Sequence, residues 1–222
     1  MSTRQDEQTA PTAVSLEATL IESILKGDLT KAAKLAMEMS QADHESNEVI
    51  DAICEAMNIA TDLHEVAKYS EEQLEKSERA AESALDAVKG KIKIEQKKLH
   101  GRVMVASLVA DPHSFERTLM LTMLKACGFT PIDGGTELTP VQLTQAVKSH
   151  KPDVLAVPVL TKEAAQQLEE IVPIIRSNGH PPGVVVFGKG AGKLSLPTEH
   201  GSVEQDSLGA VSRVTELLIT KG

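Results

Sequence analysis

The stretch VMVASLVADPHSFERTLM, residues 103–120, decides the fold of the second half of the chain. Its first part is an apolar run rich in β-branched residues, which is typical of a strand buried on both faces. The run ends abruptly in Asp111-Pro112-His113, and apolar residues then recur at helical spacing. The stretch therefore predicts a buried strand, a short turn and a helix, with a carboxylate and an imidazole on the turn.

The same alternation continues toward the end of the chain. Apolar runs at 129–133, 153–160 and 183–188 alternate with helical patterns at 114–127, 139–149, 162–177 and 207–220. Such an alternation predicts a parallel sheet that is covered by helices on both faces. We expect residues 102–222 to form a flavodoxin-like (Rossmann-like) domain, in which ligands bind at the carboxyl ends of the strands.

The first half of the chain has a helical pattern instead. Between residues 15 and 90, Leu, Ile, Met and Ala recur at helical spacing in four segments with short connections, which predicts a four-helix bundle. Residues 1–14 are polar and contain Pro11, so we expect a flexible tail. The lysine-rich stretch 91–101 is expected to be the linker between two domains. The predicted fold class is α + α/β.

The charge of the chain is divided unevenly between these halves. The formal net charge is −9, with −12 on residues 1–88 (19 acidic against 7 basic residues) and +3 on residues 89–222 (13 against 16). Nucleic-acid binding needs clustered Lys and Arg, and stacking on single strands needs aromatic side chains. Only 2% of this chain is aromatic and it contains no Trp. We therefore expect no nucleic-acid partner.

The cysteines and the N-terminus indicate a reducing compartment. Cys54 and Cys127 lie in opposite halves without CxxC spacing, so we expect free thiols. The first residues lack the apolar core of a signal peptide, and no apolar run reaches transmembrane length. These features predict a cytoplasmic protein without a membrane partner.

The Asp-Pro-His turn allows two interpretations. Asp111 could cap the following helix and Pro112 could start it, which leaves His113 without a role. Alternatively, His113 is a metal ligand that is oriented by a carboxylate bonded to its other ring nitrogen. Such a carboxylate fixes the ring tautomer and raises the basicity of the ligating nitrogen.

The segment DPHSFE, residues 111–116, resembles the Asp-x-His-x-x-Gly signature of cobalamin-binding domains. The stretch from Gly128 to Leu160 is similar in order and spacing to the second strand, second helix and third strand of that family. The acidic half resembles the helical cap of corrinoid methyl-carrier proteins, in particular at ILKGDLTKAAKLAMEM and VIDAICEAMNIATDLHEVAKYS. Together, the resemblance covers roughly residues 16–220.

The resemblance implies a cobalamin or related corrinoid as cofactor. It makes His113 the lower axial ligand of cobalt, bonds Asp111 to the other ring nitrogen, and places the helical cap over the reactive face of the corrin. The nucleotide tail would run between the loops that follow the first and fourth strands. The cofactor-binding positions carried over in this way are Asp111, Pro112, His113, Ser114, Glu116, Pro158, Leu160, Gly188, Lys189, Gly190, and, from the cap, Met57 and His64.

The same resemblance implies a function. The chain would be the carrier subunit of a cobalamin-dependent methyltransferase system, which passes a methyl group on cobalt between partner methyltransferases, with a reductive activase as a further partner. Two alternatives stay open. One is a cobalamin or other tetrapyrrole sensor that acts through a partner protein, and the other is a degenerate member that no longer binds the cofactor.

Three residues depart from the family pattern, and all stand where the nucleotide tail is held. Glu116 replaces the signature glycine, Pro158 replaces the serine of the third-strand motif, and Lys189 replaces the second glycine after the fourth strand. The charged side chain of Glu116 stands where the family's glycine lets the cofactor approach the backbone closely. Lys189 adds a cation that could meet a phosphate. We expect that cobalt ligation is kept and that the tail is treated differently, or that another tetrapyrrole is bound.

Two other functions suggested by the glycine-rich loop and the parallel sheet are disfavoured. GKGAGK, at 188–193, has three residues rather than four between its first Gly and its Gly-Lys pair, and Leu194 follows in place of Ser or Thr, so it is not a phosphate loop. A phosphorylated receiver domain needs an Asp at the end of the third strand, where VPVLT has none.

Overall fold

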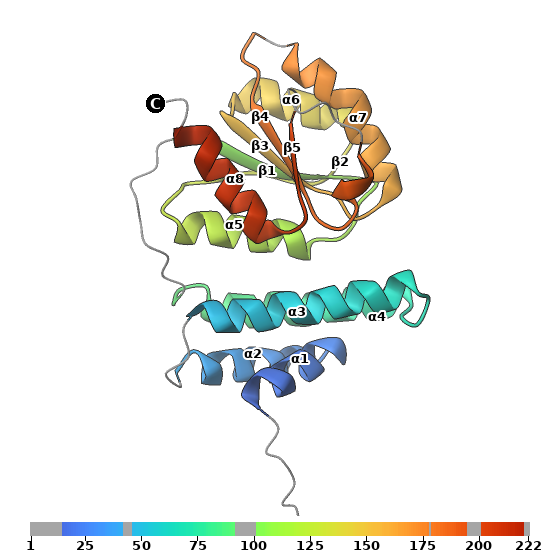
Figure 1. The fold of residues 1–222 in the computed structure, drawn as a ribbon, viewed down its shortest axis with the longest axis vertical. Helices are drawn as coiled ribbons and strands as arrows, with labels where there is room; N and C mark the ends of the chain where they lie inside the picture. Colours follow the sequence, from blue (N-terminus) through green and yellow to red (C-terminus); the bar gives the residue numbers. More distant parts are fainter. Residues whose placement is uncertain (1–14, 42–45, 92–100, 178, 195–200, 220–222) are drawn as a thin grey trace, which may run out of the picture.

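The structure is a computed structural model that describes residues 15–41, 46–91, 101–177, 179–194 and 201–219. The expected tail at 1–14 and nearly all of the expected linker at 91–101 lie outside the described residues. Figure 1 shows a helical bundle on one side of the molecule and a sheet covered by helices on the other. The predicted α + α/β class is confirmed.

The N-terminal bundle consists of α1 (Leu16–Leu25), α2 (Leu29–Met39), α3 (Ser46–Glu65) and α4 (Glu71–Val88). The helices α1, α2 and α4 are each capped by a side-chain oxygen that accepts from a backbone N–H of the first turn, contributed by Ser15, Asp28 and Ser70. Tyr69 Oη donates to the carbonyl oxygen of Leu25 at 3.1 Å. This bond fixes the end of α1 to the start of α4.

The second half contains a five-stranded parallel sheet in the order β2-β1-β3-β4-β5. The strands are β1 (Val103–Leu108), β2 (Ile132–Leu138), β3 (Val154–Pro158), β4 (Gly183–Phe187) and β5 (Ser202–Glu204). The three central strands are buried along almost their whole length, which explains their continuous apolar sequences. This strand order is the flavodoxin-like one, whose switch point lies between β1 and β3.

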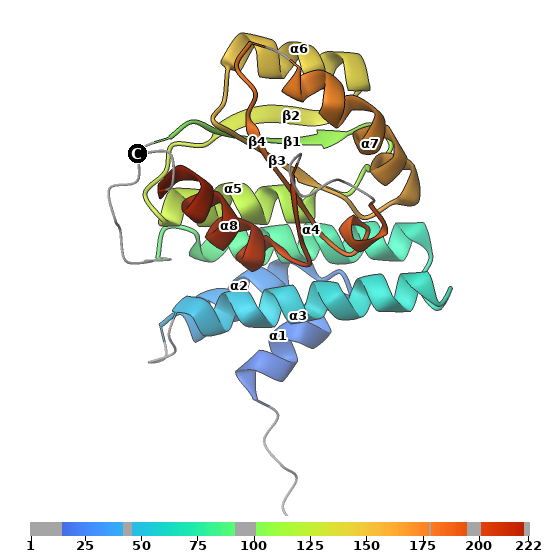
Figure 2. The same ribbon diagram turned by 45° about the horizontal axis from the view of Figure 1, so that its top comes forward.

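Helices cover both faces of the sheet. The helices α5 (Phe115–Ala126) and α8 (Ser207–Ile219) lie on the face toward the bundle, and α6 (Pro140–His150) and α7 (Lys162–Arg176) lie on the other (Figures 1 and 2). The apolar side chains of the bundle, of α5 and of α8 form one continuous core. A second core lies between the sheet, α6 and α7. In the described ranges, no helix is both long and apolar enough to cross a membrane.

The two edges of the sheet differ from the sequence prediction. The apolar run at 129–133 predicts the second strand, but β2 begins at Ile132 and continues to Leu138. Its sequence, IDGGTEL, has little apolar pattern because β2 is a largely exposed edge strand. Gly135, at φ +102°, adopts a left-handed conformation where the pairing with β1 shifts register. The short edge strand β5 is not predicted at all, because three residues carry no usable period.

Candidate functional site

The turn that follows β1 is fixed by the carboxylate of Asp111. This side chain is buried, and its Oδ2 atom accepts from the backbone N–H of Leu160 at 2.5 Å and from that of Thr161 at 3.4 Å. The Thr161 hydroxyl in turn donates to the carbonyl oxygen of Ala110 at 2.7 Å. Burial raises the pKa of Asp111, and the Leu160 N–H lowers it in part. Asp111 therefore binds the β1 loop to the β3 loop.

The interpretation in which Asp111 caps the following helix is wrong. The residue that precedes α5 is Ser114, whose side chain makes no capping hydrogen bond to the helix. The hydroxyl of Ser114 instead donates to Glu82 Oε1 at 2.8 Å, and Thr118 Oγ1 donates to the same oxygen at 3.1 Å. The polar groups at the start of α5 are thus turned toward α4 of the bundle. Pro112, between the two, is exposed.

The imidazole of His113 is buried between the two halves of the molecule. Its side chain is about one-tenth exposed, and Nδ1 lies 2.8 Å from Oε1 of Glu78 on α4. Its Nε2 atom lies 3.9 Å from Oε1 of Glu71, whose other oxygen is 3.3 Å from Nε2 of His64. The carboxylate at His113 Nδ1 is therefore Glu78 and not the expected Asp111, because Asp111 is bonded to the β3 loop.

The environment of His113 favours its protonated form. Burial by itself lowers the pKa of the imidazole, but the hydrogen bond and the charge of Glu78, with smaller contributions from Asp111 and Glu71, outweigh it. The net result is a pKa of His113 above its usual value. The helical bundle thus supplies a buried carboxylate that stabilises the protonated ring.

Sequence reasoning missed Glu78, although the sequence carries a signal for it. The buried stripe of α4 contains Leu74, Ala81, Leu85 and Val88, and Glu78 interrupts this stripe at the same helical spacing. A carboxylate in an apolar stripe requires a buried partner. That partner is His113.

Glu116, the residue that replaces the signature glycine, points into the space between α5 and α8. Its carboxylate accepts a hydrogen bond from Ser207 Oγ at the start of α8. Burial raises the pKa of Glu116; the Ser207 hydroxyl opposes the shift, and the charge of Asp206 adds to it. A cavity of about 210 Å³ lies beside Glu116, and it is also lined by Asp51 and Glu55 of α3. The predicted tail position is therefore rich in carboxylates.

The loops after β3 and β4 pack tightly against one another. A Cβ atom on Gly190 would lie 2.7 Å from the backbone of Leu160, and one on Gly188 would lie 2.9 Å from the carbonyl oxygen of Val159. The Gly190 N–H donates to that same oxygen at 2.9 Å. Pro158 is the last residue of β3 and is buried beside Phe187 of β4. These predicted positions do lie together at the carboxyl edge of the sheet.

Lys189 is engaged by the bundle. Its ammonium group donates to Asp62 Oδ1 at 2.5 Å and to the carbonyl oxygen of Asn58 at 2.9 Å, both on α3. A cavity of about 660 Å³ lies between α3 and this loop, lined by Asn58, Asp62, Glu65, Gly188, Lys189, Gly192, Gln205 and Asp206. It is large enough for a sizeable part of a cofactor.

Of the two cap residues expected at the corrin, only one is near the site. Met57 is buried in the core of the bundle. His64 is partly buried. Its Nδ1 atom donates to the carbonyl oxygen of Tyr69 at 3.2 Å, and its Nε2 atom lies 3.3 Å from Glu71, which links it to His113. Cys54 and Cys127 are free thiols, as expected.

In comparisons with known proteins, no family model matches this chain and no curated protein matches it in sequence. Several solved structures resemble it. The monomethylamine corrinoid protein of Methanosarcina barkeri is 17% identical, with a TM-score of 0.75 over 89% of this chain and 96% of that chain. The methanol:cobalamin methyltransferase complex of the same organism is 16% identical, with a TM-score of 0.47 over 92% and 80%. A cobalamin-binding protein of Desulfitobacterium hafniense DCB-2 is 16% identical, with a TM-score of 0.47 over 92% and 99%.

The first of these likenesses defines the class of fold. This chain shares with the monomethylamine corrinoid protein the succession of a helical bundle and a Rossmann-like parallel sheet over nearly the full length of both chains. At 17% identity, the likeness describes the fold, and the chemistry of the site has to be argued from the residues themselves.

Proposed function

We propose that this chain binds cobalamin or a related corrinoid through His113 and carries a methyl group on its cobalt between partner methyltransferases. The observation that carries the proposal is the setting of His113. Its buried ring follows β1 at the carboxyl edge of the sheet, with Nδ1 bonded to a carboxylate and Nε2 outside hydrogen-bond distance of Glu71. In this proposal, residues 15–90 are the cap and residues 102–222 are the cofactor domain, and the shared fold supports that division.

The residues present fit a cobalt ligand at His113. A metal-ligating imidazole commonly donates its second N–H to a carboxylate, which fixes the tautomer. A metal at Nε2 would have to replace the second proton, which the raised pKa of His113 favours, while the other proton would stay on Nδ1 facing Glu78. Among the described residues, no cluster of three or more His, Cys, Asp or Glu side chains has the arrangement of a metal site. A single protein ligand suits a metal that is already held by a macrocycle.

The bound group would supply a cobalt atom that takes up a methyl group as the equivalent of a methyl cation and releases it in the same form. The chain itself orients His113 through Glu78 and keeps the ring away from water. It also fixes the β1 loop through Asp111. The partners are then a methyl-donating and a methyl-accepting methyltransferase, with a reductive activase as a third.

The positions assigned to the nucleotide tail fit an ordinary tail poorly. Glu116 and Asp206 both line the 210 Å³ cavity between α3, α5 and α8, where a phosphate would meet like charges. The ammonium group of Lys189 is engaged by Asp62. We therefore propose that the corrinoid is held from the cobalt side and that its tail, where it has one, is not inserted beside Glu116.

Absorption spectroscopy tests corrinoid binding through His113 and the proposed treatment of the tail. The chain is incubated with hydroxocobalamin, or with the tail-less cobinamide, and then desalted. We expect the chain to retain corrinoid, His113→Ala to lose it, and the exposed matched control His150→Ala to retain it. Cobinamide is expected to be retained at least as well as cobalamin. If wild-type protein retained neither compound, corrinoid binding would be excluded; if it retained cobalamin alone, the treatment of the tail would be wrong.

A further inference from the structure

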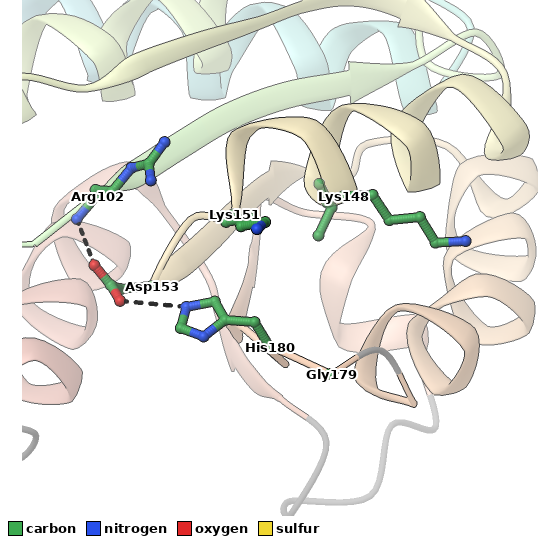
Figure 3. A pocket seen from close by; sticks show the side chains of 7 residues that line it. Arg102, Lys148, Lys151, Asp153, Gly179 and His180 are labelled. Atoms are coloured by element: carbon green, nitrogen blue, oxygen red, sulfur yellow. Dashed lines mark hydrogen bonds and ion pairs between the residues drawn. The ribbon is translucent and has the colours of Figure 1, made fainter.

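A hollow with a basic lining opens at the opposite end of the sheet from His113. It has a volume of about 610 Å³ and is lined by Arg102, Val147, Lys148, Lys151, Asp153, Gly179 and His180. These residues come from three places: the segment before β1, the end of α6 with the turn that follows it, and the loop before β4 (Figure 3). The hollow therefore lies at the amino ends of the strands, apart from the site proposed for the corrinoid.

Most of the positive charge around this hollow has no counter-charge. Asp153 accepts from the backbone N–H of Arg102 at 2.8 Å and lies 3.7 Å from Nε2 of His180, as Figure 3 shows. Within the described part of the chain, no carboxylate lies at ion-pair distance from the guanidinium group of Arg102 or from the ammonium groups of Lys148 and Lys151. Three cations and one carboxylate give a local charge of about +2 in a chain whose net charge is −9.

Favourable interaction with the C-terminal end of α6 explains only some of the basic residues that line the hollow. Lys148 lies in the last turn of α6, where a cation favours the negative end of the helix dipole. Arg102 and His180, however, belong to other segments and reach the same hollow. Lys151 occupies the left-handed position after α6, at φ 45° and ψ 57°. Gly or Asn is preferred at such a position, so Lys151 adopts this conformation at a cost in backbone energy.

We propose that this hollow binds a small molecule that carries a phosphate group. The guanidinium group of Arg102 can meet two phosphate oxygens at once, and Lys151 can act as a point charge on another. The side chain of Lys148 extends away from Arg102 in Figure 3 and adds to the positive charge of the lining. Val147 lies at the base of the hollow but is only 2% exposed, so recognition rests on the charged groups around it. The volume is within the usual range of roughly 300–1,000 Å³ for small-molecule sites. A concave site suits a compact ligand better than a flat protein surface.

Titration calorimetry at low ionic strength tests this proposal on the full chain without added corrinoid. The probes are inorganic pyrophosphate, which tests charge alone, and adenosine 5′-diphosphate, which carries the same two phosphates on an organic molecule. We expect saturable binding of one molecule per chain. Arg102→Gln and Lys151→Asn should each weaken it by roughly tenfold, because each removes charge-assisted hydrogen bonds. Lys125→Gln is the matched control, because Lys125 is an exposed lysine in the last turn of α5, away from the hollow.

Lys151→Asn gives a second, independent measurement. Asparagine tolerates the left-handed conformation, so this variant should unfold at a temperature equal to or higher than that of the wild type while it loses affinity for pyrophosphate. The proposal is overturned if neither probe binds saturably, or if Lys125→Gln weakens binding as much as Lys151→Asn. Binding of polyglutamate without binding of either probe would also overturn it, since the surface would then recognise an acidic protein. Because no corrinoid is present, these outcomes are independent of the function proposed for His113.

Discussion

The Nδ1 atom of His113 lies 2.8 Å from Oε1 of Glu78, and both side chains are at most about one-tenth exposed. The two residues are 35 positions apart and belong to the two halves of the molecule, so this buried contact helps to join the turn after β1 to helix α4. The contact orients the imidazole, and it also ties the position of the bundle to the state of this ring.

We predict that Glu78→Ala lowers the free energy of unfolding by about 1.5–3 kcal/mol, the range for a hydrogen bond to a charged group. The reason is that the substitution leaves the buried His113 ring without its carboxylate. Chemical denaturation measures the change, with Glu75→Ala, an exposed glutamate on the same helix, as the control. A double-mutant cycle with His113→Ala should show coupling. Equal effects of the Glu78 and Glu75 variants would contradict the buried pair.

The pH dependence of stability is expected to carry a signature of Glu116. Its pKa is raised above the ordinary value of 4.5, so the folded state binds this proton more tightly than the unfolded state does. Its contribution to stability is then fully present below pH 4.5 and is lost as the pH rises through the folded-state pKa. Glu116→Gln should remove this part of the decline, whereas Glu163→Gln, on the exposed start of α7, should leave the profile unchanged. Denaturation midpoints measured between pH 4 and 8 would show no difference between the two variants if the carboxyl group were solvated.

Cys54 should be chemically inert in the folded protein. Burial, with the nearby charges of Glu116 and Asp51, raises the pKa of its thiol from 9.0 to about 12. The thiolate is the reactive species, so alkylation by iodoacetamide at pH 8 should be about a thousandfold slower than for an ordinary thiol. Mass spectrometry of the labelled peptides measures the rate, and labelling in denaturant provides the unprotected reference. Equal rates in the folded and denatured protein would disprove the assignment.

The packing of the β3 and β4 loops predicts a contrast between two glycines in GKGAGK. A Cβ atom on Gly190 would meet the backbone of Leu160 at 2.7 Å, whereas one on Gly192 would meet nothing within 4 Å. Gly190→Ala should therefore destabilise the fold by about 1–3 kcal/mol, and Gly192→Ala should be nearly neutral. Thermal denaturation of the two variants tests this. A neutral Gly190→Ala would mean that the loops are not in contact.

The sequence predicts the centre of this fold better than its edges. The strands β1, β3 and β4 are found because both of their faces are buried and their apolar runs are continuous. The edge strand β2 is misplaced because none of its residues is fully buried, and Gly134-Gly135 has no side chains to carry a pattern. Strand β5 has only three residues.

The candidate site is also predicted only in part. The turn from Asp111 to Ser114 is recognisable because its residues are adjacent in the chain. The contact between His113 and Glu78 depends on how the bundle is placed against the sheet, which no local pattern encodes. The interrupted stripe of α4 shows that a buried partner must exist, although the stripe alone does not reveal which residue it is.

The bundle, α5 and α8 share one continuous apolar core. The two halves of the chain are thus one cooperative unit, and heating should produce a single unfolding transition in place of two. A partner that displaces the bundle to reach His113 would expose apolar surface on the bundle and on helices α5 and α8. Such a partner must therefore present an apolar surface that covers the exposed one. The shape and polarity of that surface, as much as the chemistry at His113, would then determine which proteins can dock here.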